Sequence, residues 1–303
     1  MLYKIRDRLR RLQFRHKSQG VLRALPLSLE PSSPAIVFTQ LPHKDVMMFL
    51  VAVRSFVEYV PIKQVHVLDD GTLTEADKDL LRSQLPGLAF HDLAEFRSSA
   101  CPSGGCWERL LGISDLVRDH YVVQLDSDTL AVAALNEVAA CIRDSTSFTL
   151  GTWDRQQLEP MVERAVQARK IRDGRGSTHI QIMAEASLDK LPGYRSLRYV
   201  RGCAGFAGFG ARSFSREAVE TLSQNMYAAL GAQWNTWGSE QVASNIIVAN
   251  AARAEVLPHP KYCACNRVTS DTAFIHFIGD CRFKHGTYVR LAKRAIAEWT
   301  SHV

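Results

Sequence analysis

Residues 107–130 read WERLLGISDLVRDHYVVQLDSDTL, a helical pattern followed by an apolar run that ends in two acidic residues. The run 121–125 is short, apolar and rich in valine, which is typical of a buried strand. Asp126 and Asp128 follow it at once, with Ser127 between them. In doubly wound sheets, ligands bind beyond the carboxyl ends of strands, and hard divalent cations prefer carboxylate oxygens. This placement favours a site for a hard divalent cation at Asp126 and Asp128; a simple polar turn is the alternative.

Strand and helix patterns alternate over the first 130 residues. Apolar runs predict strands at 35–39, 64–68, 88–91 and 121–125. Helical patterns lie between them at 46–59, 74–84 and 107–119. This alternation predicts an α/β fold, with a Rossmann-like, mostly parallel central sheet and helices on both faces.

The second half of the chain is less regular. We expect strands at 148–153 and 274–278, and helices at 238–252 and 285–300. The charged, glycine-bearing segment 169–176 is expected to be a loop, and residues 172–179 a mobile lid over phosphates. Without repeats or low-complexity linkers, we expect one domain over 21–303, preceded by a separate tail at 1–20.

The composition sets the class of protein. The chain has 303 residues, of which 46% are hydrophobic and 22% charged, so it can bury a sizeable core and is neither disordered nor fibrous. The longest apolar stretch, 46–60, is broken by Arg54 and is too short to span a bilayer. The first twenty residues lack the apolar segment of a secretory signal. Seven scattered cysteines favour reduced thiols in a cytoplasmic protein over a disulfide framework, or over a zinc site at Cys263, Cys265 and Cys281.

The excess positive charge is confined to the N-terminal tail. Residues 1–20 hold seven basic residues and one acidic residue, which accounts for the whole net charge of +6. Leu2, Tyr3, Ile5, Leu9 and Leu12 fall near one helical face. A basic amphipathic helix of this kind can lie peripherally on the anionic inner face of a membrane. A solvated helix is the main alternative, and we expect no nucleic-acid partner.

The segment 107–130 resembles the GT-A glycosyltransferases, in particular the retaining, galactosyltransferase-like family eight. In that family an Arg-Leu pair on a helix precedes the strand that carries the metal-binding DxD. The resemblance extends over residues 35–290. It implies a Mn²⁺- or Mg²⁺-dependent transfer of a sugar from a nucleotide-diphosphate sugar, most simply a UDP-sugar, to a hydroxyl of a glycan or lipid-linked acceptor. Arg109 would contact the donor's diphosphate or sugar, with donor binding over 35–130 and the acceptor half over 131–303.

Two further segments are similar to motifs of the same family. Residues 240–245, EQVASN, resemble its DQDxxN segment, which places Glu240 and Gln241 under the donor sugar and the reacting carbon. The segment that begins at His276 and Gly279 resembles the HxxGxxK motif, whose His completes the metal site and whose Lys contacts phosphate. Here Arg282 stands at the Lys position and Lys284 follows two residues later, so either cation could bind the diphosphate.

The remaining candidates depend on position in the predicted sheet. Asp69 and Asp70 end the second strand in a DDGT turn that resembles the nucleobase-reading DDGS of the inverting family-two enzymes, although such turns are also common structurally. Thr39 ends the first strand and is a candidate donor contact. Asp154 follows the 148–153 strand and either faces the donor sugar or starts a helix. The glycine-rich run 203–210 is either an acceptor-side strand or a tightly packed one.

Three other functions remain open. An inverting glycosyltransferase would use Glu240 as the base that deprotonates the acceptor. A nucleotidyltransferase shares the sheet and metal, but residues 39–44 lack the glycine-rich phosphate loop expected of it. A non-catalytic sugar-nucleotide-binding module is disfavoured by the presence of Arg109, Asp126, Asp128 and His276 together.

Overall fold

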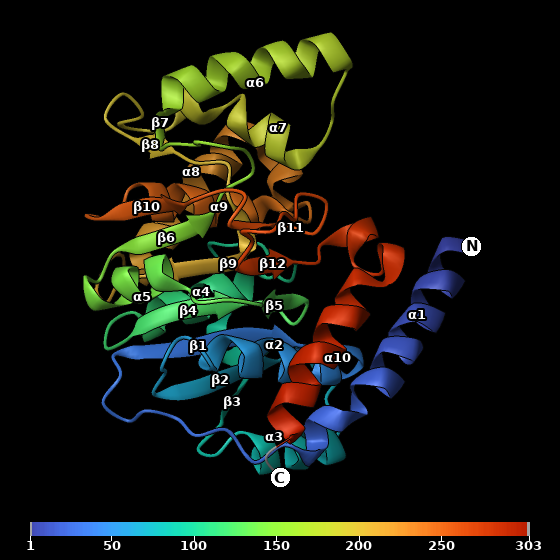
Figure 1. The fold of residues 1–303 in the computed structure, drawn as a ribbon. Helices are drawn as coiled ribbons and strands as arrows, with labels where there is room; N and C mark the ends of the chain where they lie inside the picture. Colours follow the sequence, from blue (N-terminus) through green and yellow to red (C-terminus); the bar gives the residue numbers. More distant parts are fainter. Residues whose placement is uncertain (1, 302–303) are drawn as a thin grey trace. The chain divides into compact units, whose positions relative to one another are not determined.

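The computed structural model describes the backbone of residues 2–301 and the side chains of residues 8–279 and 281–301. Seven strands form one sheet in the order β10-β6-β9-β4-β1-β2-β3 (Figure 1). The pairs β1/β2, β2/β3 and β10/β6 are parallel, whereas β6/β9 is antiparallel. The expected α/β fold with a mostly parallel sheet is therefore confirmed. The chain forms two compact units: a first unit of residues up to 92, 123–139 and from 260, and a second unit of 93–122 and 140–259.

The first unit is built on three parallel strands. They are β1 (Ala35–Leu41), β2 (Gln64–Asp69) and β3 (Ala89–Asp92). The connecting helices are α2 (Val46–Val57) and α3 (Glu75–Gln84). Every residue of α2 from Val46 to Phe56 is buried, because this helix is apolar on all sides and is covered by neighbouring helices as well as by β5. A capping box formed by Thr74 and Asp77 starts α3.

A small second sheet completes this unit and positions the acidic loop. The strand β4 (Tyr121–Leu125) leads through residues 126–128 into β5 (Thr129–Ala131). β5 pairs antiparallel with β12 (Phe274–His276), which in turn pairs parallel with β11 (Tyr262–Ala264). In this register His276 lies opposite Thr129. Residues almost 150 positions apart are thereby held side by side.

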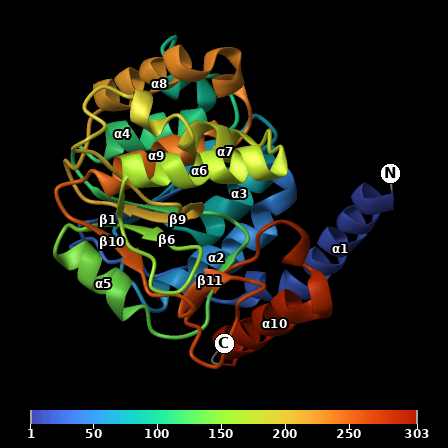
Figure 2. The ribbon, with the colours of Figure 1, turned by 90° about the horizontal axis from the view of Figure 1, so that it is seen from above.

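The helices α1 (Leu2–Ser18) and α10 (Thr287–Thr300) lie side by side in the first unit (Figures 1 and 2). The predicted N-terminal helix is confirmed, but it is not a free tail, because Phe14 and Val21 are buried. The Phe14 ring lies 4.3 Å from that of Tyr288 on α10. The apolar face predicted from Leu2, Tyr3 and Ile5 lies outside the described side chains.

The second unit contains strands of the large sheet, a separate two-stranded ribbon and several helices. The strands are β6 (Ser147–Leu150), β9 (Cys203–Phe209) and β10 (Ala254–Leu257), with a two-stranded ribbon of β7 (Glu159–Pro160) and β8 (Arg198–Tyr199). The helices are α4 (Trp107–Leu116), α6 (Met161–Arg175), α7 (Ile180–Glu185), α8 (Arg216–Leu230) and α9 (Ser239–Ala249), while α5 (Asn136–Arg143) continues into the first unit. Gly208 on β9 is required by packing, since a Cβ there would come within 2.2 Å of the Phe148 ring.

The prediction of a loop at 169–176 is wrong. These residues belong to the end of α6, and Gly176 closes the helix in the left-handed conformation. The segment is helical because Arg164, Ala165 and Ala168 bury one face, while Gly174 costs only about 1 kcal/mol inside a helix. The lid proposed for 172–179 loses its basis, since its first half is helical. The strand expected at 148–153 ends at Leu150.

The cysteine prediction is wrong for one pair. Cys265, just after β11, and Cys281, a few residues after β12, form a disulfide. The parallel pairing of these strands brings the two Cα atoms to 5.9 Å, which sequence spacing alone does not reveal. Among the other described cysteines, Cys141 and Cys263 are buried thiols. Within residues 2–301, no helix is long and apolar enough to cross a membrane.

Candidate active site

Three potential metal ligands converge at the end of β4. One ligand atom each of Asp126, Asp128 and His276 lies within 4.8 Å of the others. His276 Nε2 is 3.2 Å from Asp128 Oδ1 and 3.9 Å from Asp126 Oδ2. Asp128 and His276 are buried, whereas the Asp126 side chain is 30% exposed and gives the group access to solvent. Two carboxylates and an imidazole in this arrangement fit a Mn²⁺ or Mg²⁺ ion with further positions for phosphate oxygens.

The loop between the two aspartates is held by backbone contacts. The Phe277 amide donates to the Asp128 carbonyl over 2.8 Å, and the Thr129 hydroxyl donates to the Asp126 carbonyl over 2.8 Å. The Tyr288 hydroxyl donates to the Ser127 carbonyl over 3.3 Å. Ser127 thus contributes its backbone to the loop's shape, and α10 helps to hold the acidic pair in place.

Arg282 binds the same carboxylate that the metal group uses. Its guanidinium forms an ion pair with Asp128 Oδ2, and its Nε donates to the Phe277 carbonyl over 3.0 Å. Burial raises the pKa of Asp128, but His276 and Arg282 outweigh this effect and lower it to about 2. Asp128 is consequently ionised at neutral pH and carries a fixed negative charge.

Gly279 and Lys284 both follow the strand β12. Gly279 has a φ of +57° and begins a short 3-10 turn. Lys284 is exposed and lines a cavity of about 620 Å³ together with His285 and the Cys265–Cys281 disulfide. Of the two cations predicted to contact phosphate, Arg282 is therefore engaged with Asp128, and Lys284 faces solvent.

The other candidate residues of the first unit make contacts close to their own positions in the chain or lie buried in a strand. The Asp69 carboxylate accepts from the Gly71 amide over 2.8 Å and pairs with Lys78 over 3.1 Å. Asp70 accepts from the Thr72 amide over 3.0 Å. These contacts stabilise the DDGT turn itself. The Thr39 hydroxyl is fully buried on β1 without a hydrogen-bond partner among the described residues.

In the second unit, Arg109 and Glu240 form a buried pair. Arg109 on α4 donates to Glu240 Oε1 at the start of α9 over 3.4 Å, and both side chains are about 5% exposed. Trp107 on α4 also donates to the Ser239 hydroxyl over 2.9 Å. The WERL and EQVASN segments, 131 residues apart, are thus brought together as the resemblance implied.

The neighbouring candidates are more exposed. Gln241 is half-buried, and the Asp154 side chain is 73% exposed and ion-paired with His259. Trp237, just before α9, is 75% exposed, unlike Trp107 and Trp234, which are buried in edge-to-face contact. An exposed tryptophan beside the start of α9 presents a flat apolar surface of the kind that stacks on sugars.

A buried polar cluster next to α9 was not predicted. Glu185, fully buried, forms ion pairs with Arg201 and Arg164 and accepts a hydrogen bond from the Tyr199 hydroxyl over 3.0 Å. Asn245, from the EQVASN segment, donates to the Tyr199 hydroxyl and to the Gly202 carbonyl. No sequence spacing links these residues, although Glu185 in an otherwise apolar helix was a usable signal for a buried partner.

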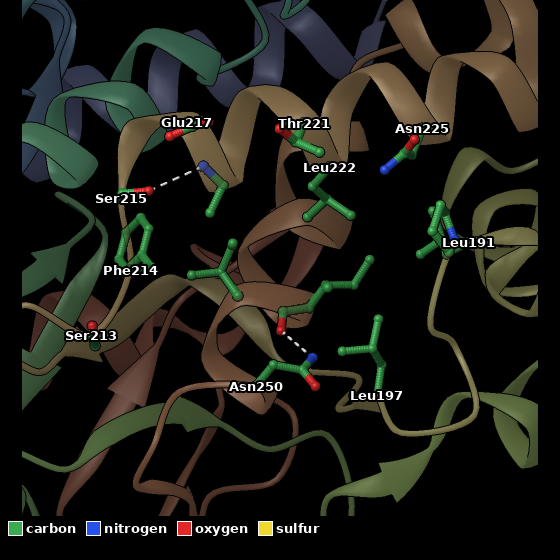
Figure 3. Close-up of a pocket in the computed structure, with 14 residues that line it drawn as sticks. Leu191, Leu197, Ser213, Phe214, Ser215, Glu217, Thr221, Leu222, Asn225 and Asn250 are labelled. Atoms are coloured by element: carbon green, nitrogen blue, oxygen red, sulfur yellow. Dashed lines mark hydrogen bonds between the residues drawn. The ribbon is translucent and has the colours of Figure 1, made fainter.

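The second unit also contains an apolar cavity of about 600 Å³ that involves none of the predicted residues (Figure 3). It is bounded by α8, the end of α9 and the 191–197 segment, with Leu191, Phe214, Leu222 and Asn250 on its walls. Asn250 is turned back to the Ile246 carbonyl at the end of α9. The cavity therefore lies at the opposite end of α9 from Glu240.

The sequence matches no family model and no curated protein sequence. Among solved structures, an active-site mutant of LgtC is similar over 87% of this chain and 95% of its own, with 14% identity and a TM-score of 0.51. The chain has a GT-A fold. It is also similar to WbbM, a bifunctional glycosyltransferase, at 13% identity over 84% of this chain with a TM-score of 0.47. GlyE, a glycosyltransferase of Streptococcus pneumoniae TIGR4, gives 12% identity over 88% of this chain and a TM-score of 0.49. This GT-A chain spans 47% of WbbM and 63% of GlyE.

Proposed function

We propose that the protein is a metal-dependent glycosyltransferase that moves a sugar from a nucleotide-diphosphate sugar to a hydroxyl acceptor. The convergence of Asp126, Asp128 and His276 at the end of a central strand carries this proposal. The GT-A fold supports it, since LgtC, which shares this fold, is a galactosyltransferase solved with donor and acceptor sugar analogs.

In the proposed reaction, the bond between the anomeric carbon and the diphosphate oxygen breaks, and its electron pair leaves with the nucleoside diphosphate. The acceptor oxygen then bonds to that carbon, and its proton passes to the departing diphosphate oxygen. A Mn²⁺ or Mg²⁺ ion held by Asp126, Asp128 and His276 would supply Lewis-acid stabilisation of the departing diphosphate. Lys284, which is exposed, adds positive charge for the same diphosphate.

The local chemistry of Glu240 supports a retaining outcome. A base in an inverting enzyme must reach the acceptor hydroxyl directly. Glu240 is buried and accepts a hydrogen bond from Arg109, so the carboxylate oxygen that faces Arg109 is not free to take a proton from an acceptor. We propose that Glu240 and Gln241 stabilise positive charge on the donor sugar, with Arg109 fixing the orientation of Glu240.

We also propose which residues contact the donor. We assign the nucleobase of a UDP-sugar to the Asp69–Asp70 turn and to Thr39, and the phosphates to the Gly279 segment. Asp154, exposed at the end of a loop after β6, is proposed to face the donor sugar.

We also propose that the acceptor is a glycan or lipid-linked glycan at the inner face of an anionic membrane, which α1 contacts peripherally. Leu9 and Leu12 are 60% and 53% exposed, and exposed Arg8, Arg15 and Lys17 belong to the same helix. Exposed leucines among cations are typical of helices that lie on anionic lipid surfaces.

The proposal is tested with purified protein, Mn²⁺ and a panel of sugar nucleotides. A glycosyltransferase releases nucleoside diphosphate from one or a few of them, while a nucleotidyltransferase releases pyrophosphate from a nucleoside triphosphate and a sugar phosphate. Saturable sugar-nucleotide binding without release of either product would instead identify a binding module.

A further inference from the structure

The N-terminal helix is linked to the candidate metal group by a row of alternating charges. Arg11 on α1 forms an ion pair with Asp45 over 2.5 Å. Asp45 immediately precedes α2, but its side chain makes no capping hydrogen bond with that helix. Arg282 forms an ion pair with Asp128, which in turn contacts His276.

Asp45 and Arg282 attract each other electrostatically. Burial raises the pKa of Asp45, and the positive charges of Arg11, Lys44 and Arg282 oppose that rise, while Asp128 adds to it. Burial lowers the pKa of Arg282, and the carboxylates of Asp128 and Asp45 more than compensate. Arg282 is thus attracted by two buried carboxylates, one a candidate metal ligand and the other bound to α1.

Apolar contacts fix α1 in the position that this row of charges requires. Phe14 packs on Tyr288, whose ring also stacks at 4.1 Å on Phe277, the residue after His276. The Arg11 guanidinium lies 6.0 Å from the centre of the Phe283 ring. Since Arg282 also bonds the Phe277 carbonyl, α1 is connected to the same segment by packing and by charge.

A guanidinium and a divalent cation both draw on the negative charge of one carboxylate, since Arg282 pairs with Asp128 Oδ2 while Asp128 Oδ1 faces His276. Arg282 is permanently charged and occupies Asp128 Oδ2 in a buried setting, where charge interactions are strong. The hold of Arg282 on Asp128 is opposed by the electrostatic attraction of Arg282 to the Asp45 carboxylate. Arg11 neutralises Asp45 and so leaves Arg282 on Asp128.

We propose that Arg282 is an internal counter-ion that competes with the divalent cation for Asp128, and that Arg11 and Asp45 are positioning residues that set the strength of this competition. The helix α1 thereby tunes the metal affinity of the Asp126–Asp128–His276 group. This inference rests on the proposed metal site.

The test is calorimetric titration of the full chain with Mn²⁺ alone, without donor or turnover. Arg282→Gln removes the competitor and should tighten Mn²⁺ binding by roughly tenfold, and Arg11→Gln should tighten it by about threefold. In the double variant, Arg11→Gln should add nothing to the effect of Arg282→Gln, because its effect passes through Arg282.

Two control variants accompany these. Arg11→Lys keeps the charge and should bind Mn²⁺ like the wild type. Arg15→Gln, an equal loss of charge on the exposed side of α1, is the matched control and should change affinity less than about 1.5-fold.

Thermal melts establish that each variant is folded before titration. Weaker Mn²⁺ binding by Arg282→Gln would overturn the inference, since Arg282 would then support the site. A full Arg11→Gln effect in the Arg282→Gln background would overturn the role of Arg11. If the wild type binds Mn²⁺ and all variants match it, the metal site stands and this inference fails. If the wild type does not bind Mn²⁺, both fail.

Discussion

At the scale of single residues, Asp128 has the most constrained environment in the first unit. One carboxylate oxygen faces His276 Nε2 and the other faces Arg282, and the side chain is buried. A buried carboxylate held by a histidine and a guanidinium stays ionised, which suits a metal ligand and equally suits a structural ion pair. Substitution separates these roles, because only the first makes Asp128 necessary for cation binding.

Asp128→Asn should weaken Mn²⁺ binding by more than roughly 100-fold, since losing a direct ligand exceeds the 10–100-fold cost of losing an outer partner. Mn²⁺ titration measures this, and circular dichroism checks that the variant is folded. Asp271→Asn, on an exposed turn of the same unit, is the control and should bind like the wild type. Unchanged Mn²⁺ affinity in Asp128→Asn would remove Asp128 from the metal site.

Glu240 is the residue on which the stereochemical proposal depends. Its carboxylate is buried against Arg109, so we expect a product whose anomeric configuration is retained, as read by NMR. Glu240→Gln keeps the shape and the acceptor for Arg109 but loses the charge, and it should lower kcat by roughly 100-fold. The exposed Glu217→Gln is the control. An inverted product would reject the proposal and assign Glu240 as the base.

At the scale of elements, both terminal helices carry exposed cations. Exposed cations lie on α1 at Arg8, Arg15 and Lys17, and on α10 at Arg290, Lys293 and Arg294. Deleting α1 is a poor test of these cations, because Phe14 is buried against Tyr288 and its loss would expose that ring. Neutralising exposed cations leaves that packing intact.

Replacing Arg8, Arg15 and Lys17 together by Gln should weaken binding to anionic vesicles by on the order of 100-fold, since each cation contributes about 1 kcal/mol at such a surface. Co-sedimentation at low salt measures the effect. A variant with Gln at exposed Arg155, Lys170 and Arg175 loses equal charge in the second unit and should sediment like the wild type. Equal sedimentation of both variants would leave α1 without a membrane role.

At the scale of the whole molecule, the strands β1 to β4, β6 and β12 were accessible from sequence, whereas β5, β10 and β11 were not predicted. Apolar runs such as 121–125 encode burial directly, and the DxD that follows β4 pointed to the site. His276 was found only through the resemblance, since no local pattern joins it to Asp128. The helix α6 was missed because its buried face is short and polar residues dominate it.

Long-range charge pairing was the least predictable feature. Arg282 was expected to bind phosphate, yet it reaches Asp128 across 154 positions, and Arg11 reaches Asp45 across 34. The Cys265–Cys281 disulfide likewise depends on the pairing of β11 with β12. Such contacts follow from the assembled sheets, whereas composition and spacing record only the local preferences of each segment.

The most direct test of the central claim is the metal dependence of sugar-nucleotide turnover by the full chain. Nucleoside diphosphate release from the preferred donor should fall to background after chelation, return with added Mn²⁺, and stay at background in Asp128→Asn at any Mn²⁺ concentration that serves the wild type. Release that persists undiminished in the chelated protein and in Asp128→Asn would contradict a metal-dependent glycosyltransferase built on Asp126, Asp128 and His276.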